Sequence, residues 1–286
     1  MEQNQTKSMG SKNLTSVQKR EPTKRGLKFK PNGNGTCKLV GTGLFLEKEV
    51  LIPIMHEGMR VTEIEKDAFK GCRHLKSIIV PNSVTNIGEG AFSGCSGLTS
   101  ITIPFVGKSK NTRSASEISV LGYIFGKSNY AGGNQTRQFY ALARYADYCI
   151  PQALTSVTVT DGEILSGAFW GCKNLKNIVI GNGVTNIASK AFSSCQNLTR
   201  VIIVNGITNI GYDTFFGCES LTNITIPESV THIGDSAFNG CKRLSVIRYN
   251  GTIEQWNAIQ KGVYWNDRIP AREILCFDGS ISVNAW

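Results

Sequence analysis

Residues 221–241, LTNITIPESVTHIGDSAFNGC, decide the fold, because the same pattern returns along the chain at a fixed interval. Cysteines mark the pattern every 23 residues, at Cys72 and Cys95 and again at Cys172, Cys195, Cys218 and Cys241. Phenylalanines keep the same interval three positions earlier. An apolar set that recurs roughly every 20 to 29 residues is typical of a solenoid. One unit cannot bury its apolar face alone, so we expect stacked units with a core that runs along the axis.

Each unit is predicted to hold one short strand and a small apolar corner. Leu221, Ile224 and Ile226 lie in a run rich in Thr and Ile, which favours a strand whose alternate side chains point inward. Ala237 and Phe238 follow as a small and a large side chain that turn inward at the corner. Turns around this corner are predicted at two glycines, Gly234 and Gly240.

Length and composition agree with a repeat protein. The chain has 286 residues, of which 41% are hydrophobic, 18% are charged and 30 are glycine, which suits a continuous core with many tight turns. In a solenoid the length sets the number of repeats. No apolar run of about 18 residues occurs, so the sequence predicts no transmembrane segment.

Residues 1–26 are predicted to form a disordered basic tail. They carry six Lys or Arg residues against Glu2 and Glu21 and almost nothing apolar, so they cannot offset the entropy of ordering. The segment lacks the apolar stretch of a secretory signal peptide. Its composition suits a solvated leader, and a tail that contacts nucleic acid or an anionic surface stays open as the alternative.

The repeats are expected to occupy residues 61–248, with a different unit at each end. An N-terminal hairpin cap is predicted at 27–60, because alternating residues flank the turn-forming run at 31–35, PNGNG. Terminal units must differ from internal ones, since an end coil has no neighbour to cover it.

The C-terminal cap, predicted at 249–286, begins with a short helix. Thr252 and Gln255 form a capping box at its start. Gly262 is expected to end the helix. Such a cap would hide the apolar underside of the last coil and block pairing at the edge of the sheet.

One repeat carries 33 extra residues, and the segment that contains them, 105–151, which we call the insertion, is unlike the rest of the chain. The strand leucines Leu98 and Leu154 are 56 residues apart where 23 are expected. The insertion is predicted to replace the Ala-Phe-x-Gly-Cys corner, which this repeat lacks. It holds eight aromatic and six basic residues against Glu117 and Asp147. An insertion in a solenoid maps to a loop on one face and often marks the binding face.

Three interpretations of the insertion stay open. Tyr and Arg are enriched at interfaces, so contact with a protein or glycan is one. Stacking on single-stranded nucleic acid is the second. The third is structural, in that the aromatic side chains bury the insertion against the edge of the solenoid.

The predicted strands leave their third and fifth positions facing outward, which defines a weakly charged stripe along the sheet. From this stripe and the insertion we select the candidate binding residues Tyr123, Tyr130, Arg137, Tyr140, Arg144, Tyr145, Asn177, Arg200, Asn223 and Arg248. A small and partly apolar stripe suits broad, shallow contact with a protein or an extended polymer. An ordinary solvated sheet face is the alternative.

No catalytic residue, metal site or cofactor is predicted. Six of the nine cysteines form the regular ladder, as buried thiols that fill small apolar corners do, and no C-x-x-C pair occurs. The three histidines are scattered, so a zinc site is not expected. The glycines of the sequence do not have the spacing of a phosphate-binding motif. We therefore expect that the protein is not an enzyme, and an enzyme built on a repeat scaffold is the remaining alternative.

The pattern L-x-x-I-x-I-P-x-x-V-T-x-I-G-x-x-A-F-x-G-C resembles the BspA-type leucine-rich repeat. Residues 98–104, 230–234 and 237–241 carry it almost letter for letter, and the resemblance covers about residues 27–280. It implies an α/β-type repeat solenoid, a leucine-rich-repeat horseshoe of about 23-residue turns that is mostly β with short helical turns. A parallel β-sheet is then expected on the concave face.

The same resemblance implies a role in binding. Members of the family are mostly surface or secreted proteins that bind components of a host or a neighbouring cell, so it implies a non-catalytic, adhesion-type interaction with a protein or glycan. Binding of nucleic acid or an anionic surface through the tail and insertion is the alternative. Because no signal peptide is visible, a cytoplasmic location stays open beside the cell surface.

Overall fold

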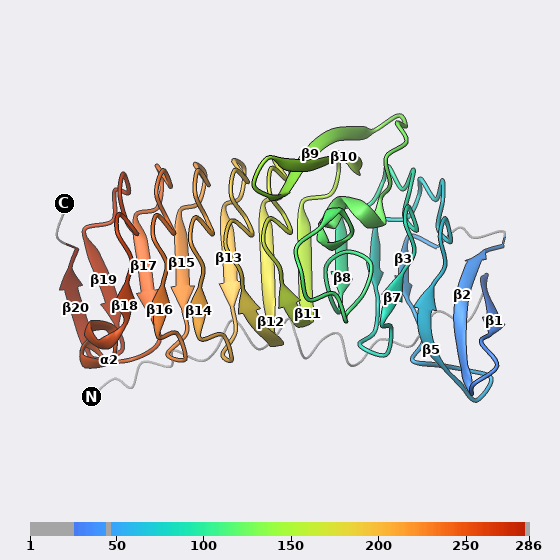
Figure 1. Cartoon of the computed structure of the whole chain (residues 1–286), viewed down its shortest axis with the longest axis horizontal. Helices are drawn as coiled ribbons and strands as arrows, with labels where there is room; N and C mark the ends of the chain where they lie inside the picture. Colours follow the sequence, from blue (N-terminus) through green and yellow to red (C-terminus); the bar gives the residue numbers. More distant parts are fainter. Residues whose placement is uncertain (1–25, 44–46, 284–286) are drawn as a thin grey trace, which may run out of the picture.

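The structure, a computed structural model, describes residues 26–43 and 47–283. The chain winds into a row of stacked coils that is mostly β (Figure 1). This confirms the solenoid predicted from the 23-residue pattern. The tail predicted at 1–26 lies outside the described residues, apart from Gly26.

The first strands of successive coils form one parallel sheet along the molecule, which we call the main sheet. Each strand pairs with the strand of the next coil, so alternate side chains all point into the core. In chain order these strands are β3 (Glu49–Leu51), β6 (Ser77–Ile79), β8 (Ser100–Ile103), β11 (Ser156–Ile164), β12 (Asn177–Ile187), β13 (Arg200–Ile203), β15 (Asn223–Ile226), β17 (Val246–Tyr249) and β19 (Glu273–Cys276). At the C-terminal edge, β20 (Gly279–Ser282) pairs with β19 in the antiparallel direction.

A second row of short strands crosses the coils after the first turn. β14 (Asn209–Ile210), β16 (His232–Ile233) and β18 (Gln260–Lys261) pair in parallel, and the long strand β12 continues into this row. Nearer the N-terminus, β7 (Asn86–Ile87) pairs in parallel with β5 (Met59–Ile64). The apolar interior lies between the two rows of strands and the Ala-Phe corners.

Phenylalanines stack on one another from coil to coil inside this core. The ring centroids of Phe169, Phe192, Phe215 and Phe238 are successively 5.0, 5.3 and 5.4 Å apart. All four side chains are fully buried. Burial of each such side chain contributes roughly 1.5–3 kcal/mol, so the stack is a main source of stability.

The six repeat cysteines form a buried line beside the phenylalanines, as their spacing predicts. The Sγ atoms of Cys195, Cys218 and Cys241 each donate to the carbonyl oxygen of the phenylalanine in the preceding coil, at 3.1, 3.2 and 3.2 Å. All nine cysteines of the chain are free thiols. Burial raises the pKa of Cys195 and of Cys241 to about 12, so both thiols stay protonated.

Two positions of the repeat require glycine for different physical reasons. Gly240 adopts φ 76°, in the left-handed region, and turns the chain after the corner as predicted. Gly234 is required by close packing, because a Cβ at this position would lie 2.5 Å from the backbone nitrogen of Tyr212 in the preceding coil. The tight approach of neighbouring coils therefore excludes a side chain there.

The N-terminal end begins with a hairpin. β1 (Leu27–Pro31) and β2 (Thr36–Thr42) pair in the antiparallel direction, as the intervening turn residues predict. β2 then pairs in parallel with β5, and β4 (Met55–His56) folds back on β5. The hairpin thereby joins the second row of strands.

The C-terminal end carries the short helix α2 (Ile253–Ala258). Its predicted capping box is present, since Thr252 Oγ1 accepts from the nitrogen of Gln255 at 3.2 Å and Gln255 Oε1 accepts from the nitrogen of Thr252 at 2.8 Å. The prediction that Gly262 ends the helix is wrong. The helix stops earlier, because the two residues of β18 extend to pair with β16 in the second row.

Candidate interaction surfaces

The outward face of the main sheet carries two rows of side chains in register. The row at the third strand position consists of Ser77, Ser100, Ser156, Asn177, Arg200, Asn223 and Val246. The row at the fifth position consists of Ile79, Thr102, Thr158, Val179, Ile202, Thr225 and Arg248. All of these residues are partly or fully exposed. The structure thus brings three candidates, Asn177, Arg200 and Asn223, together on neighbouring strands.

The insertion leaves these rows unbroken. β8 pairs directly with β11, with Ser100 opposite Ser156, although 56 residues separate them in the sequence. The nitrogen of Thr155 donates to the carbonyl oxygen of Thr99 at 3.0 Å just before the two strands begin. The insertion therefore lies within the coil that joins β8 to β11 and displaces neither strand.

The insertion also supplies the corner that its repeat lacks. The nitrogen of Phe92 donates to the carbonyl oxygen of Ile124 at 2.9 Å, as the nitrogen of Phe69 donates to that of Ala91 at 2.7 Å in the coil before. The ring of Phe125 lies 6.3 Å from that of Phe92 and continues the stack. This confirms that the insertion replaces the Ala-Phe corner.

Gln138, on β9 (Gly133–Ala141), fixes the insertion to the following coil. The side chain is fully buried, and its Oε1 accepts from the nitrogen of Gly122 at 2.6 Å. Its Nε2 donates to the carbonyl oxygens of Ala168 and Trp170, at 3.3 and 3.4 Å, and to Cys172 Sγ at 3.4 Å. These bonds satisfy buried polar groups where the regular pairing between coils is interrupted. This residue could not be predicted from the sequence, because one polar side chain in a polar hairpin gives no signal.

β9 and β10 (Arg144–Pro151) form an antiparallel hairpin that lies along the upper edge of the solenoid (Figure 1). Its tip exposes two large apolar side chains, Leu142 at 95% and Tyr145 at 47%. The candidate Arg144 is exposed between them. Leu142 was not among the predicted residues, because an isolated leucine in the sequence is as easily buried as exposed.

Arg137 is held across the hairpin by Asp147. Its Nε lies 2.9 Å from Oδ1 and its Nη2 lies 3.1 Å from Oδ2. The guanidinium group lies 4.1 Å from the centroid of the Tyr145 ring. The hydrogen bond from Arg137 lowers the pKa of Asp147, which keeps the carboxylate charged. Two candidates, Arg137 and Tyr145, are thus fixed in one orientation.

Four of the six basic residues of the insertion form ion pairs. The pairs are Lys110–Asp161 at 2.5 Å, Arg113–Glu163 at 3.7 Å, Lys127–Glu117 at 3.2 Å and Arg137–Asp147 at 2.9 Å. The first two attach the insertion to β11. Because each pair neutralises one positive charge, the insertion attracts a polyanion less than its basic composition implies.

Three candidate tyrosines lie toward the solenoid. Tyr123 is buried, with 8% of its surface exposed. The hydroxyl of Tyr130 donates to the carbonyl oxygen of Cys149 at 2.8 Å, and Tyr140 packs against the hydrophobic core. These residues support the insertion, whereas Arg144 and Tyr145 face solvent.

A groove of about 470 Å³ lies between β9 and the turns of the next two coils. We call it the hairpin groove, and it is lined by Asn134, Gln135, Thr136, Arg137, Phe139, Trp170, Gly171, Lys173, Ser194 and Gln196. The rings of Phe139 and Trp170 meet edge to face at 4.4 Å. Lys173 and Gln196 each stand four residues before a strand of the main sheet, so the groove lies where these strands begin.

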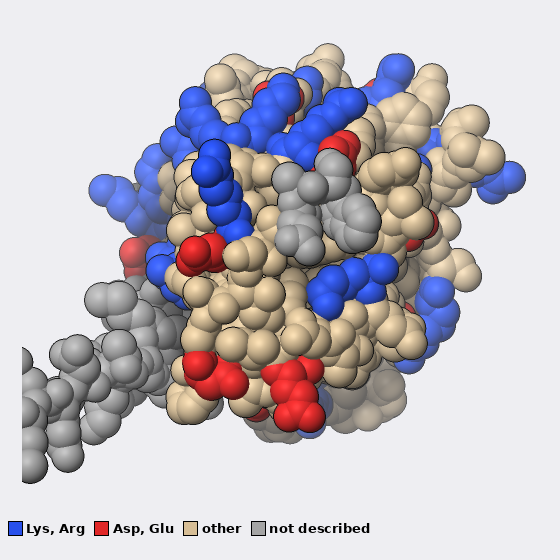
Figure 2. Space-filling view, turned by 90° about the vertical axis from the view of Figure 1, so that its left-hand side faces the viewer, with Lys and Arg blue, Asp and Glu red and all other residues tan. Residues whose placement is uncertain are grey.

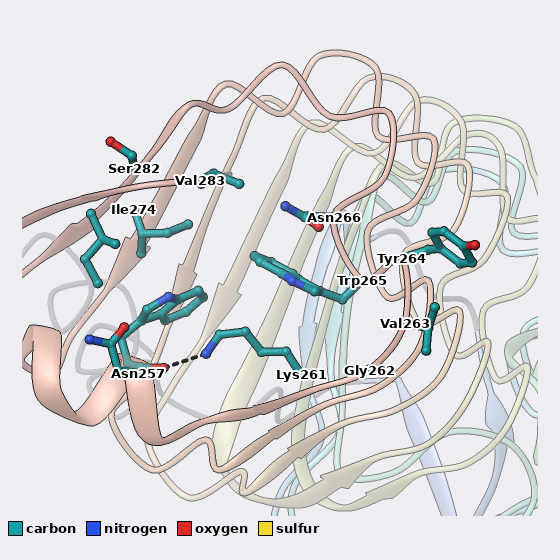
Figure 3. A pocket seen from close by; sticks show the side chains of 12 residues that line it. Asn257, Lys261, Gly262, Val263, Tyr264, Trp265, Asn266, Ile274, Ser282 and Val283 are labelled. Carbon is teal, nitrogen blue, oxygen red and sulfur yellow. Dashed lines mark hydrogen bonds between the residues drawn. The ribbon is translucent and has the colours of Figure 1, made fainter. Parts of the chain in front are cut away.

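A second hollow, of about 570 Å³, opens at the C-terminal end (Figure 3). Trp256 and Trp265, with ring centroids 5.8 Å apart, both line it. Lys261 Nζ donates to the carbonyl oxygens of Trp256 and Ile259 at 2.7 and 3.0 Å. Burial lowers the pKa of Lys261. This lysine therefore caps the C-terminal end of α2, because it donates to carbonyl groups that the helix leaves unpaired.

Charge is unevenly distributed when the molecule is seen from this end. Figure 2 shows Lys and Arg side chains gathered along the upper rim, with acidic side chains prominent lower down. In Figure 1 the strands of the main sheet begin on this upper side. One ion pair on these turns joins Lys242 to Glu219 at 2.9 Å.

Two further features are absent from residues 26–43 and 47–283. Within these ranges no helix is long and apolar enough to cross a membrane. The same residues contain no group of three or more His, Cys, Asp or Glu side chains placed to hold a metal ion.

Comparison with known families identifies the class of protein. The model of the BspA type leucine rich repeat region matches in six copies, over residues 48–129 and 146–268. The chain therefore belongs to this family of leucine-rich repeat proteins. The gap between the matched ranges covers β9 and the tip of the hairpin, so this part of the chain departs from the family pattern. No curated protein matches the sequence.

Several solved structures are similar in fold. A leucine-rich repeat protein of T. pallidum is 21% identical, with a TM-score of 0.43, and the match covers 87% of this chain and 91% of that one. A leucine-rich repeat protein from Bacteroides ovatus is 20% identical, with a TM-score of 0.38 and coverage of 91% and 72%. The pneumococcal vaccine antigen PcpA is 16% identical, with a TM-score of 0.38 and coverage of 90% and 87%.

Proposed function

We propose that this protein is a non-catalytic, adhesion-type interaction module that binds a protein or glycan partner through the outward face of the main sheet and the exposed side of the hairpin. The observation that carries the proposal is the register of the two outward rows across seven strands. Only Arg200 and Arg248 in these rows are charged, so a partner can cover the face at a small desolvation cost.

The hairpin supports the same role. Its tip holds Leu142 and Tyr145 in solvent, the Arg137–Asp147 pair joins its two strands, and Gln138 fixes it against the coils. A contact surface on a rigid element loses less conformational entropy when a partner binds. β9 and the tip of the hairpin also lie outside the family pattern, which suits a segment that distinguishes this chain from its relatives.

Binding of nucleic acid through the insertion has weaker support. Ion pairs already engage four of its six basic residues, which reduces the number of phosphate groups that it could neutralise. The basic tail lies outside the described residues.

The test is to identify a partner by cross-linking in a native extract and then to measure its affinity for purified variants. Leu142→Ser combined with Arg144→Ala changes the tip, and Arg200→Glu combined with Arg248→Glu changes the sheet face. We expect each double variant to weaken binding at least about tenfold, or by roughly 1.4 kcal/mol. Thr185→Ala, an exposed site in the second row, serves as the control. Unchanged affinity in both double variants, with circular dichroism and melting temperature intact, would refute the proposal.

A further inference from the structure

We infer that the hairpin groove is a binding site for an acidic saccharide, a sugar unit that carries a carboxylate group. The inference rests on the proposed interaction role and narrows it to one class of ligand at one site. It is carried by the aromatic wall of the groove, its neutral polar groups, its unbalanced positive charge and the closed edge of β9.

The aromatic wall suits the apolar face of a sugar ring. Trp170 is partly exposed in the groove, and Phe139 holds it by an edge-to-face contact at 4.4 Å. A fixed aromatic ring packs on flat, C–H-rich surfaces with little loss of side-chain entropy. Small-ligand sites generally combine such a wall with a few placed polar groups.

The polar groups of the groove are mostly neutral amides and hydroxyls. They belong to Asn134, Gln135, Thr136, Ser194 and Gln196. Amides and hydroxyls can both donate and accept, so they match the hydroxyl groups of a sugar, which also do both. Gln135 additionally donates to the side chain of Asn129, which steadies it at the rim.

The charged side chains of the groove favour an anionic ligand. The lining includes Arg137 and Lys173 but no Asp or Glu. Lys173 is exposed, and in the described part of the chain no ion pair engages it. Asp147 engages Nε and Nη2 of Arg137 and leaves Nη1 outside that pair. A ligand carboxylate would find the ammonium group of Lys173 and the Nη1 donor of Arg137 in one cavity.

The geometry of β9 argues against an extended peptide. A peptide would be expected to add as a third strand on the free edge of the hairpin. The carbonyl oxygens of Arg137 and Phe139 lie instead against glycines of the next coil. A Cβ added at Gly171 would lie 3.0 Å from the carbonyl oxygen of Arg137, and one at Gly167 would overlap that of Phe139. This edge is therefore occupied, and a compact ligand fits better than a strand.

The experiment is isothermal titration calorimetry of the full chain with three probes of equal length: tetragalacturonate, uncharged maltotetraose and an end-blocked tetraglutamate peptide. We expect saturable binding of tetragalacturonate that is at least about tenfold tighter than binding of either other probe. Lys173→Gln should weaken that binding at least about fivefold. Lys176→Gln, a change at an exposed lysine on the same turn but outside the groove, should leave it unchanged.

A spectroscopic readout separates a site effect from misfolding. Tetragalacturonate should change the tryptophan fluorescence of the wild-type protein and should leave that of a folded Trp170→Phe variant unchanged. No binding of tetragalacturonate at millimolar concentration, equal effects of the two lysine variants, or preference for the tetraglutamate peptide would each overturn the inference. If tetragalacturonate does not bind but the sheet-face variant still weakens binding of the cross-linked partner, the saccharide inference is wrong and the proposed interaction role is retained.

Discussion

The side-chain amide of Gln138 lies 3.4 Å from the Sγ of Cys172, so that a residue of the hairpin joins the line of repeat cysteines. In the later coils each cysteine donates to a phenylalanine carbonyl of the coil before it. At Cys172, which follows the insertion, the Sγ atom instead accepts a hydrogen bond from the side-chain amide of Gln138. The hairpin is therefore built into the core and is more than a loop on its surface.

Replacing Gln138 should destabilise the whole protein. In Gln138→Leu the nitrogen of Gly122 and the carbonyl oxygen of Trp170 lose buried partners, and each such loss costs about 1–3 kcal/mol. Urea unfolding followed by circular dichroism should show a decrease of roughly 2–4 kcal/mol in the free energy of unfolding. Gln135→Ala, at an exposed position on the same strand, is the control. Equal stability of the two variants would contradict the role assigned to Gln138.

Adjacent phenylalanines should respond differently to truncation. Phe215 is fully buried in the stack, whereas Phe216 is 41% exposed. Phe215→Ala leaves a cavity between two rings and is expected to cost about 3–5 kcal/mol, while Phe216→Ala should cost well under half as much. Thermal and urea unfolding measure both. Similar losses would mean that the stack does not carry the stability of the coils.

Thiol reactivity should distinguish one cysteine from the other eight. Cys276 is partly exposed and all the others are buried. Ellman's reagent should therefore modify one thiol per chain rapidly in the native protein and all nine in guanidinium chloride. Cys276→Ser should abolish the rapid phase. Rapid modification of two or more thiols in the folded wild type would show that the cysteine line is accessible.

Stability should fall in alkaline solution. Burial raises the pKa of Cys195 and Cys241 to about 12, against about 8.5 in an unfolded chain. The stabilisation from the protonated thiols is thus complete below pH of about 8.5 and is lost as pH rises toward the folded pKa. Between about pH 9 and 10.5 the free energy of unfolding should decrease more steeply for wild type than for a Cys195→Ala, Cys241→Ala variant. Parallel slopes would contradict this.

The periodic part of the fold could be predicted in detail from the sequence. Identical residue types at a fixed interval stack on one another, so the spacing alone predicted the phenylalanine stack, the cysteine line and the register of outward residues such as Asn177 and Arg200. The end of α2 could not be predicted. It depends on pairing between β18 and β16, a contact between distant segments that overrides the local helix signal at Gly262.

The insertion was less predictable because it has no period. Its hairpin register shifts between Arg144 and Tyr145, which breaks the alternation of inward and outward side chains on that strand. Composition alone also could not separate the buried Tyr123, which lies before the hairpin, from the exposed Tyr145. The burial of Gln138 was equally hidden, since its partners Ala168 and Trp170 lie about 30 residues further along the chain.

Because β8 pairs directly with β11, the geometry of the sheet does not depend on the length of the chain between these two strands. A different excursion could be grafted between Ile103 and Ser156 without resetting any coil beyond the junction. The replacement segment must supply an aromatic ring that packs on Phe92, as Phe125 does now. It must also supply a side-chain amide that makes the hydrogen bonds of Gln138. An inserted segment of another length or sequence is therefore compatible with the sheet, provided that it supplies these two contacts.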